Sequence, residues 1–473
     1  MQFSQSSFYG RLGAVAGAIA LLASCGGGGG GSGGAFFPLT TPTQVQPEVP
    51  AQEQPVAEVP VVEKRAVGGT VSGLVGTLVL QNNAGDDLQL TADGKFSFAS
   101  GVAIGSGYAV SVRTQPYWQV CSITQGSGTI KADVGDVAVV CAKGVPGVST
   151  LAGRGTRGLV NANGIAAAFS DPFGIVVNKS GELFVADEGN NRVRKIMPNG
   201  DVSTFAGSGA AASVNGNGIS ASFNNVTALG LAPSGDLYAA EFMGNKIRRI
   251  TPAADVSDFA GSGAPGNDSG NGMAATFTGL IAMTVDGSGN IYVAELNTSR
   301  IRKITPAGDV SPVAGSGSFG FAEGTGAAAS FYRPYGVAAD AAGNLFVADS
   351  TNNRIRKVTP AGVVETFAGT GVAGSANGQA DVATFDRPGG VAFDAFGNLY
   401  VADTGNSVLR KITPEGVVST FAGKAGVMGT QNGIGTDARF SEPSALTVGA
   451  DGTIYVADTL NHLIRKISPV AAP

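Results

Sequence analysis

Short runs of alternating apolar and polar residues, separated by turn residues, fill the chain from Pro146 onward. Residues 336–369 contain four of them, "GVAAD", "NLFVAD", "RIRKVT" and "VVETFAG", with the turns "AAGN", "STNN" and "PAG". Alternation over short runs bounded by Gly, Asn and Pro is typical of β-strands joined by tight turns. This segment therefore predicts a four-stranded antiparallel meander.

The same pattern recurs six times. Corresponding residues lie 54 positions apart four times and then 55 apart. The recurring residues are a Phe (Phe169, Phe223, Phe277, Phe331, Phe385, Phe440), an acid (Asp187, Glu241, Glu295, Asp349, Asp403, Asp458) and an Arg (Arg194, Arg248, Arg302, Arg356, Arg410, Arg465). Such self-similarity indicates one structural unit used six times, and a four-stranded meander repeated around a ring is a β-propeller blade. The sequence predicts an all-β fold with a six-bladed propeller at residues 146–473.

The two ends of this region indicate how the ring closes. The sixth unit stops at "LIRKISPVAAP" and lacks a fourth strand, while "GVSTLAG" at 147–153 matches "DVSTFAG" at 201–207 but follows no first three strands. We expect Val148 to Ala152 to complete the last blade, because this leaves no open sheet edge.

The repeated pattern resembles the NHL repeat family, whose units carry similar "NLYVADTGNNRIRKIT" segments. The resemblance covers about residues 148–468 of this sequence. It implies a propeller fold. Relatives and look-alikes of this propeller include catalysts such as the amidating lyase, the streptogramin lyase and gluconolactonase-type hydrolases, and some NHL propellers bind RNA.

A second, smaller domain is predicted at residues 66–145. Its alternating runs include "TLVLQNN", "DDLQLTA" and "GKFSFAS", and "NNAGDD" and "TADGK" are typical of hairpin turns. A small antiparallel β-sandwich fits this pattern, with an accessory or spacer role. Cys121 and Cys141 lie in two of the apolar runs. We expect them to form a disulfide in an oxidising compartment, and two buried free thiols are the alternative.

The N-terminus carries a predicted export signal. Arg11 precedes a short apolar run, and "LASC" at 22–25 resembles the bacterial lipobox, in which the cysteine becomes acylated. The resemblance implies a signal peptide at 1–24, an acylated Cys25 and lipid anchoring in the cell envelope, with Gly26 favouring the outer membrane. The Gly-rich and Pro-rich remainder of residues 25–65 is predicted to be a tether. The alternative is an ordinary signal peptide with an incidental cysteine.

Composition limits the choice of partners. The chain has 473 residues, 73 of them Gly, and a net charge of −5. No basic block of the kind that binds phosphate backbones is present in the sequence, so we expect no nucleic-acid partner. Membrane contact is expected only through the lipid anchor.

The recurring acid and Arg of each unit are interpreted as structural ion pairs. An acid that ends one strand and an Arg on the next strand can hold a hairpin in register. A feature present in all six units is better explained by architecture than by a binding site. The turns "DGSGN", "DAAGN" and "DAFGN", which begin at Asp286, Asp340 and Asp394, are interpreted as Asp-initiated turns and not as calcium loops.

Function is expected where the units differ. The connections between units diverge in sequence, and each first strand contributes one variable residue near the mouth of the channel. The candidate binding face consists of Phe173, Thr227, Ile281, Arg333, Tyr335 and Ser444, with Gly389 at the equivalent place in the fifth unit. Tyr332, Phe242, Met243, Phe319 and Phe321 are expected nearby, although Phe319 and Phe321 could instead pack against neighbouring blades.

These patterns favour a non-catalytic binding or scaffold module for an envelope or extracellular protein, peptide or glycan, with no cofactor or metal. The first strands are apolar along the channel, and His462, the sole histidine, lies in a turn. A lone turn histidine is more often a solvated residue than a ligand. The alternative is a propeller hydrolase or lyase of the gluconolactonase or streptogramin lyase type, acting at the channel mouth.

Overall fold

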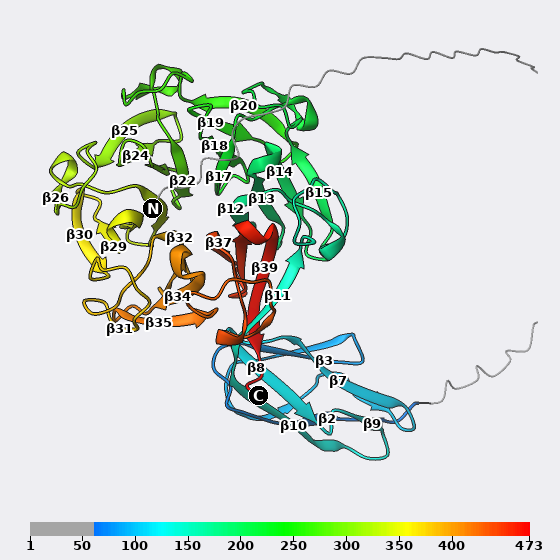
Figure 1. Cartoon of the computed structure of the whole chain (residues 1–473). Coiled ribbons are helices and arrows are strands. Elements are labelled where there is room, and N and C mark those ends of the chain that lie inside the picture. Colours follow the sequence, from blue (N-terminus) through cyan, green and yellow to red (C-terminus); the bar gives the residue numbers. More distant parts are fainter. Residues whose placement is uncertain (1–60) are drawn as a thin grey trace, which may run out of the picture. The chain divides into compact units, whose positions relative to one another are not determined.

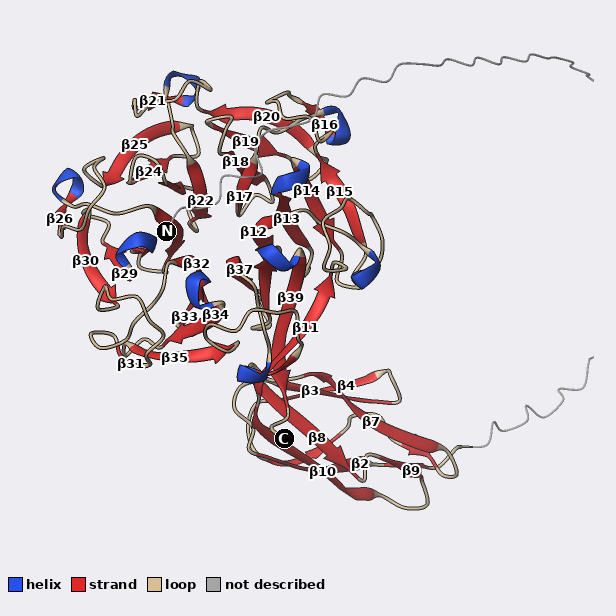
Figure 2. Ribbon diagram, in the orientation of Figure 1, coloured by secondary structure: helices blue, strands red, loops and turns tan. Residues whose placement is uncertain are grey.

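The structure is a computed structural model, and it describes residues 61–473 (Figure 1). The predicted signal peptide, Cys25 and the tether as far as residue 60 lie outside the described residues. Between residues 61 and 473, every regular element is a β-strand or a short 3-10 helix (Figure 2). In the same range, no helix has the length and apolar character needed to cross a membrane. The described chain is all-β.

The N-terminal domain contains two four-stranded sheets and one two-stranded sheet. Their orders are β5-β2-β10-β8, β4-β3-β7-β9 and β1-β6. The strands are β1 (Lys64–Arg65), β2 (Val67–Ser72), β3 (Leu78–Asn82), β4 (Asp86–Leu90), β5 (Gly94–Ser97), β6 (Val102–Ala103), β7 (Gly107–Thr114), β8 (Gln119–Thr124), β9 (Ser127–Thr129) and β10 (Val134–Lys143). Paired structure thus begins at Lys64.

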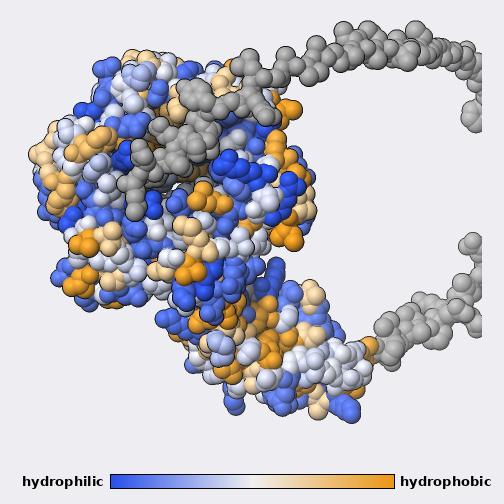
Figure 3. All heavy atoms as spheres, in the orientation of Figure 1, coloured by the Kyte–Doolittle hydropathy of each residue, from blue (hydrophilic) through white to orange (hydrophobic). Residues whose placement is uncertain are grey.

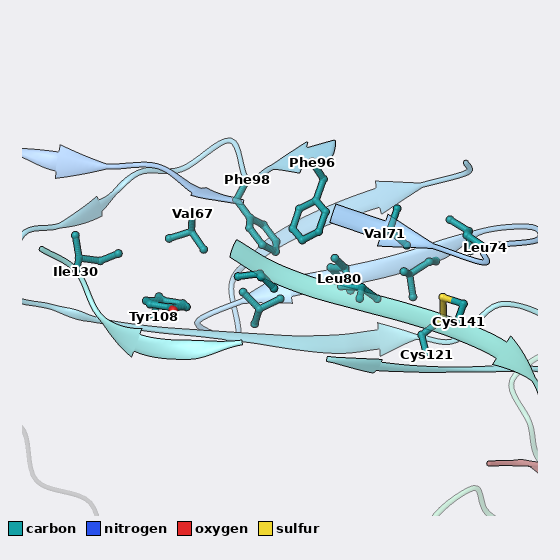
Figure 4. Close-up of a cluster of buried hydrophobic side chains, with 14 residues drawn as sticks. Val67, Val71, Leu74, Leu80, Phe96, Phe98, Tyr108, Cys121, Ile130 and Cys141 are labelled. Atoms are coloured by element: carbon teal, nitrogen blue, oxygen red, sulfur yellow. A yellow bond between two sulfur atoms is a disulfide. The ribbon is translucent and has the colours of Figure 1, made fainter. Parts of the chain in front are cut away.

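Side chains from both four-stranded sheets form one apolar core (Figure 4). Val67 and Phe96 belong to the first of these sheets and Leu80 and Tyr108 to the second, and all four are buried in the same cluster. Cys121 of β8 lies opposite Cys141 of β10, and the two form a disulfide. The disulfide therefore links neighbouring strands of one sheet.

Two expectations for this domain are wrong. The segment "TADGK" does not close a hairpin, because β4 and β5 on either side of it belong to different sheets. The domain is also not wholly antiparallel, since β2 and β10 run parallel. These two strands lie far apart in the sequence, so no tight turn forces them to run in opposite directions. "NNAGDD", by contrast, joins β3 and β4 as an antiparallel hairpin.

Six further sheets follow, one for each sequence unit. The first is β12 (Pro172–Val177), β13 (Leu183–Asp187), β14 (Arg192–Ile196) and β15 (Val202–Ala206); the second is β17 (Val226–Leu231), β18 (Leu237–Glu241), β19 (Lys246–Ile250) and β20 (Asp255–Ala260); the third is β22 (Leu280–Val285), β23 (Ile291–Glu295), β24 (Arg300–Ile304) and β25 (Asp309–Ala314). The fourth is β27 (Pro334–Ala339), β28 (Leu345–Asp349), β29 (Arg354–Val358) and β30 (Val363–Ala368); the fifth is β32 (Pro388–Phe393), β33 (Leu399–Asp403), β34 (Val408–Ile412) and β35 (Val417–Ala422). The sixth is β37 (Pro443–Val448), β38 (Ile454–Asp458), β39 (Leu463–Val470) and β11 (Val145–Ala152).

The six sheets are arranged around a common axis (Figure 1). The first strand of each sheet contacts the first strand of the next, and β37 of the sixth contacts β12 of the first. In the sixth sheet, β11 pairs antiparallel with β39, with Val148 opposite Ile467 and Thr150 opposite Arg465. A strand from before the first sheet thus lies at the outer edge of the last one.

The connections between sheets add a short fifth strand to most outer edges. These strands are β16 (Gly216–Asn217), β21 (Gly270–Asn271), β26 (Gly324–Thr325), β31 (Gly378–Gln379) and β36 (Gly433–Ile434). They pair with β20, β25, β30, β35 and β11. They cover part of each outermost strand, where unpaired backbone groups would otherwise face solvent.

Short 3-10 helices lie in the connections and in four of the turns between second and third strands. Those in the turns are η2 (Glu188–Asn190), η6 (Ser350–Asn352), η7 (Thr404–Asn406) and η9 (Thr459–Asn461). Those in the connections are η1 (Gly164–Ala166), η3 (Gly218–Ser220), η4 (Gly272–Ala274), η5 (Gly326–Ala328) and η8 (Gly435–Asp437). In an antiparallel meander these turns and connections share one side of the ring, called here the connection face. The opposite side, called the hairpin face, carries the turns between first and second strands.

Candidate functional site

The repeated acid and Arg are brought together in every sheet. The closest nitrogen-to-oxygen distances are 2.7 Å for Asp187 and Arg194, 2.8 Å for Glu241 and Arg248, 3.7 Å for Glu295 and Arg302, 3.0 Å for Asp349 and Arg356, 2.9 Å for Asp403 and Arg410, and 2.8 Å for Asp458 and Arg465. All twelve side chains are buried. These charges lie inside the sheets and are not available to a ligand at the surface.

Each Arg also ties its sheet to the preceding connection. In the first sheet, Arg194 donates to the backbone carbonyls of Ala168 and Val160, and its guanidinium lies over the ring of Phe169 at 5.0 Å. Burial raises the pKa of the six acids, while the Arg and the other donors around each carboxylate favour the charged form. Removing one partner of such a pair is strongly destabilising, because the other charge stays buried without compensation.

A third polar residue completes the pair wherever the acid is Asp. Asn190, Asn352, Asn406 and Asn461 each donate to the carboxylate three positions earlier and to a carbonyl of the preceding connection. Where the acid is the longer Glu, the equivalent residue is Gly244 or Thr298. A Cβ at Gly244 would lie 2.4 Å from Oε2 of Glu241, so the extra methylene of Glu occupies the place of the Asn. Sequence reasoning missed this role, although the spacing of acid and Asn was visible.

The candidate binding face lies largely inside the ring. Phe173, Thr227, Ile281 and Ser444 are buried, and Tyr335 is partly buried. The ring centroids of Phe173 and Tyr335 are 5.5 Å apart. Because these residues come from the first and fourth sheets, their rings meet across the axis near the connection face. Arg333, on the same face, is exposed.

Hydrogen bonds link the buried polar residues of the candidate binding face to the neighbouring sheets. Thr227 Oγ1 donates to the carbonyl of Leu280 in the next sheet at 2.8 Å. Ser444 Oγ donates to the carbonyl of Phe173 at 3.1 Å, across the junction of the sixth and first sheets. Thr227 and Ser444 therefore connect neighbouring sheets.

A group of exposed aromatic residues lies on the connection face of the fourth sheet. Phe319 and Tyr332 stack with ring centroids 5.3 Å apart, and they are 54% and 37% exposed. Phe321, 45% exposed, lies 4.2 Å from the guanidinium of Arg354. We call Phe319, Phe321 and Tyr332 the fourth-sheet aromatic cluster. Phe319 and Phe321 thus contact neighbours and still present substantial surface to solvent.

The equivalent positions in the other sheets do not carry such a cluster. Phe319 corresponds to Arg157, Ala211, Pro265, Ala373 and Met428; Phe321 to Leu159, Ser213, Asn267, Ser375 and Thr430; Tyr332 to Ser170, Asn224, Thr278, Asp386 and Ser441. The cluster is therefore a local feature superimposed on the repeated framework.

Figure 3 shows mostly hydrophilic surface on the face drawn, with hydrophobic residues in small groups. Several exposed large apolar residues of the described chain have ring contacts. Phe319 and Tyr332 contact each other, Phe321 contacts Arg354, and Phe396 in the fifth unit contacts the partly buried Tyr117. Exposed aromatic groups of this kind are enriched in binding hot spots.

The remaining candidate groups have structural contacts. His462 Nδ1 accepts a hydrogen bond from the backbone N–H of Asp171, and burial lowers the pKa of the imidazole despite the nearby Asp171 carboxylate. Asp286, Asp340 and Asp394 accept backbone N–H bonds within their own turns, as expected for turn-initiating residues. Among residues 61–473, no group of three or more His, Cys, Asp or Glu side chains could hold a metal ion.

Comparison with known proteins identifies the repeated unit. The NHL repeat family model matches residues 169–196, 331–358 and 440–467, which correspond to the first three strands of the first, fourth and sixth sheets. The chain is 29% identical over 282 residues to Protein SUPPRESSOR OF QUENCHING 1, chloroplastic, of Arabidopsis thaliana, covering 55% of this chain and 27% of that protein. It is 27% identical over 335 residues to NHL repeat-containing protein 2 of Bos taurus, covering 61% of this chain and 45% of that protein. The chain spans less than half the length of both relatives.

A solved structure supports the fold. An auxiliary nutrient binding protein from Bacteroides thetaiotaomicron VPI-5482 matches with a TM-score of 0.53 and 13% identity, covering 77% of this chain and 94% of that chain. At this identity the likeness concerns the fold alone.

Proposed function

We propose, from the premise that this chain is an NHL-repeat protein, that its ring is a non-catalytic recognition module. It binds a protein, peptide or glycan through the connection face. The observation that carries the proposal is the fourth-sheet aromatic cluster, which is exposed and confined to one of the six equivalent sheets.

The cluster has the composition of a binding hot spot. Aromatic rings gain much from burial against a partner, and they lose little conformational freedom because they have few rotatable bonds. The guanidinium of Arg354 lies against Phe321. A guanidinium group beside an exposed ring can bind carboxylates of the same partner.

The framework behind the cluster is proposed to be a closed six-bladed propeller. In this arrangement each of the six sheets is one blade, and β11 completes the last of them. Closure is supported by the contact of β37 with β12 and by the pairing of β11 with β39. A closed ring presents its loops on a rigid support, which lowers the entropic cost of binding. The N-terminal domain is proposed to be a β-sandwich with an accessory role.

The same proposal places the module at the bacterial cell envelope. The "LASC" segment at 22–25 supports acylation of Cys25, and the segment that follows would tether the two domains to the outer membrane. The fold likeness to a nutrient binding protein is compatible with ligand capture at such a surface.

The experiment is a comparison of two variants in affinity capture. Full chains carrying Phe319→Ser with Tyr332→Ser, or Met428→Ser, are immobilised and exposed to envelope extract and to a glycan array. Met428 is the matched control, because it is the equivalent of Phe319 in the sixth unit and is 55% exposed. We expect the double variant to lose the specific ligand that the wild type and the control retain. Retention of every ligand by the double variant would contradict the proposal.

A further inference from the structure

The channel between the six first strands contains a cavity with an opening on the hairpin face. Its volume is about 610 Å³, and its lining includes residues of all six first strands. At one end it is bounded by Phe173 and Tyr335, whose rings meet across the axis. At the other end it reaches Lys179 and Gly287, both exposed, so it opens to solvent there.

The wall of this cavity is mainly apolar. Leu231, Met283, Val285, Val337 and Leu446 contribute to it, and the channel also contains the hydroxyl-bearing Thr284 and Thr447. A volume of this size falls within the range of about 300–1,000 Å³ that is usual for small-molecule sites. The wall would therefore accept the apolar body of a small ligand.

Two charged residues lie at the opening, and they differ in their contacts. Asp286 already accepts bonds from the backbone N–H groups of Ser288 and Asn290, from the Asn290 amide and from the Tyr292 hydroxyl. Lys179 forms no ion pair with any residue in the range that the structure describes. The cation is thus available to a ligand, while the carboxylate is occupied by its own turn.

Lys179 is also unlike its equivalents. The corresponding residues are Pro233, Gly287, Ala341, Ala395 and Ala450, none of which is charged. The first-strand framework does not require a lysine at this position, since five of six units form the same turn without one.

We propose that this channel is a second binding site, which takes a small organic anion with an apolar body. The apolar body enters from the hairpin face and lies against the first strands, and the anionic group pairs with Lys179 at the opening. This site is separate from the recognition function proposed above, because the rings of Phe173 and Tyr335 lie between the cavity and the connection face.

The test uses two fluorescent probes that share an aromatic body and differ in charge. Anilinonaphthalenesulfonate bears an anionic sulfonate group, and phenylnaphthylamine is its neutral counterpart. Both are titrated into the full chain. We expect saturable binding of both, with the anion bound about fivefold more tightly and with that advantage reduced by added salt.

Two variants test whether the anionic group of the ligand binds Lys179 and whether its apolar body binds inside the channel. Lys179→Gln should remove the advantage of the anionic probe and leave the neutral probe unaffected, whereas Lys424→Gln, a neutralised exposed lysine outside the cavity, should change neither affinity. Thr284→Phe should abolish saturable binding of both probes by filling the channel. Thr447→Phe serves the same purpose if melting curves show that the first variant does not fold.

Three results would overturn the proposal. They are the absence of saturable binding to the wild type, equal binding of the two probes with no effect of Lys179→Gln, and full binding by a folded Thr284→Phe or Thr447→Phe chain. The recognition function proposed for the connection face would stand in each case, because none of these variants alters the fourth-sheet aromatic cluster.

Discussion

At the scale of single residues, the acid, its partner three positions later and the Arg form one interlocking set. Asp occurs with Asn at that third position, and Glu occurs with Gly244 or Thr298. Ser213 and Thr298 hydroxyl groups donate to the Glu carboxylates, whereas Asn amides donate to the Asp carboxylates. Both versions satisfy a buried carboxylate, and the length of the acid decides which partner fits.

This complementarity predicts a rescue in the second sheet. Glu241→Asp should lower the free energy of unfolding by about 1–3 kcal/mol, because the shorter acid no longer reaches the Ser213 hydroxyl and leaves buried groups unpaired. Gly244→Asn alone should also destabilise, since its side chain would collide with Glu241. The double variant should recover most of the loss. Chemical denaturation of the four proteins measures the coupling, and additive losses would contradict the account.

Sequence patterns predicted which residues recur, but not how all of them are used. The acid and Arg were identifiable because strand ends and turn lengths place them on neighbouring strands. The burial of Phe173, Thr227 and Ser444 was not predictable, because their exposure depends on the width of the channel and on a ring from the opposite sheet. Lys179 was overlooked because a lysine in a turn has no distinctive local signal.

At the scale of elements, the edge strand β11 connects the beginning of the ring to its end. Val148 is buried in an apolar cluster formed by side chains of the fifth and sixth sheets, while the adjacent Ser149 is exposed. The repeat length and the missing fourth strand of the last unit were sufficient to predict which segment lies at this edge. The crossing of β4 and β5 into different sheets of the N-terminal domain was not predictable, because a local turn signal says nothing about tertiary pairing.

The position of β11 predicts different effects for two neighbouring substitutions. Val148→Asp places a charge in the apolar cluster and should lower the melting temperature by on the order of 10 °C, whereas Ser149→Asp should change it little. Deletion of residues 147–153 removes most of β11 and should lower the melting temperature more than Val148→Asp does. Thermal unfolding followed by circular dichroism compares the three variants with the wild type. Equal melting temperatures for Val148→Asp and the wild type would argue against closure by this strand.

At the scale of the whole molecule, the framework is repetitive and the proposed functions depend on its exceptions. A buried ion pair of acid and Arg stabilises each of the six sheets, while the fourth-sheet aromatic cluster and Lys179 each occur in one unit. A ring of this kind tolerates local variation, because loops and turns can change without altering the sheets.

Anchoring of the whole molecule is predicted to depend on Cys25. Cys25→Ser should move the protein from the membrane fraction to the soluble fraction of a bacterial host, because the acyl chains supply the membrane affinity. Cys121→Ser, made together with Cys141→Ser, is the control for cysteine loss and should leave the chain in the membrane fraction. Membrane association of the Cys25→Ser chain would show that another segment anchors it.

The recognition function is tested most directly by hydrogen–deuterium exchange of the full chain with and without a captured ligand. We predict slower exchange in residues 315–333, which carry the fourth-sheet aromatic cluster, and little change in the equivalent residues 423–442 of the sixth unit. Protection confined to other surfaces, with residues 315–333 unchanged at saturating ligand, would contradict the central claim.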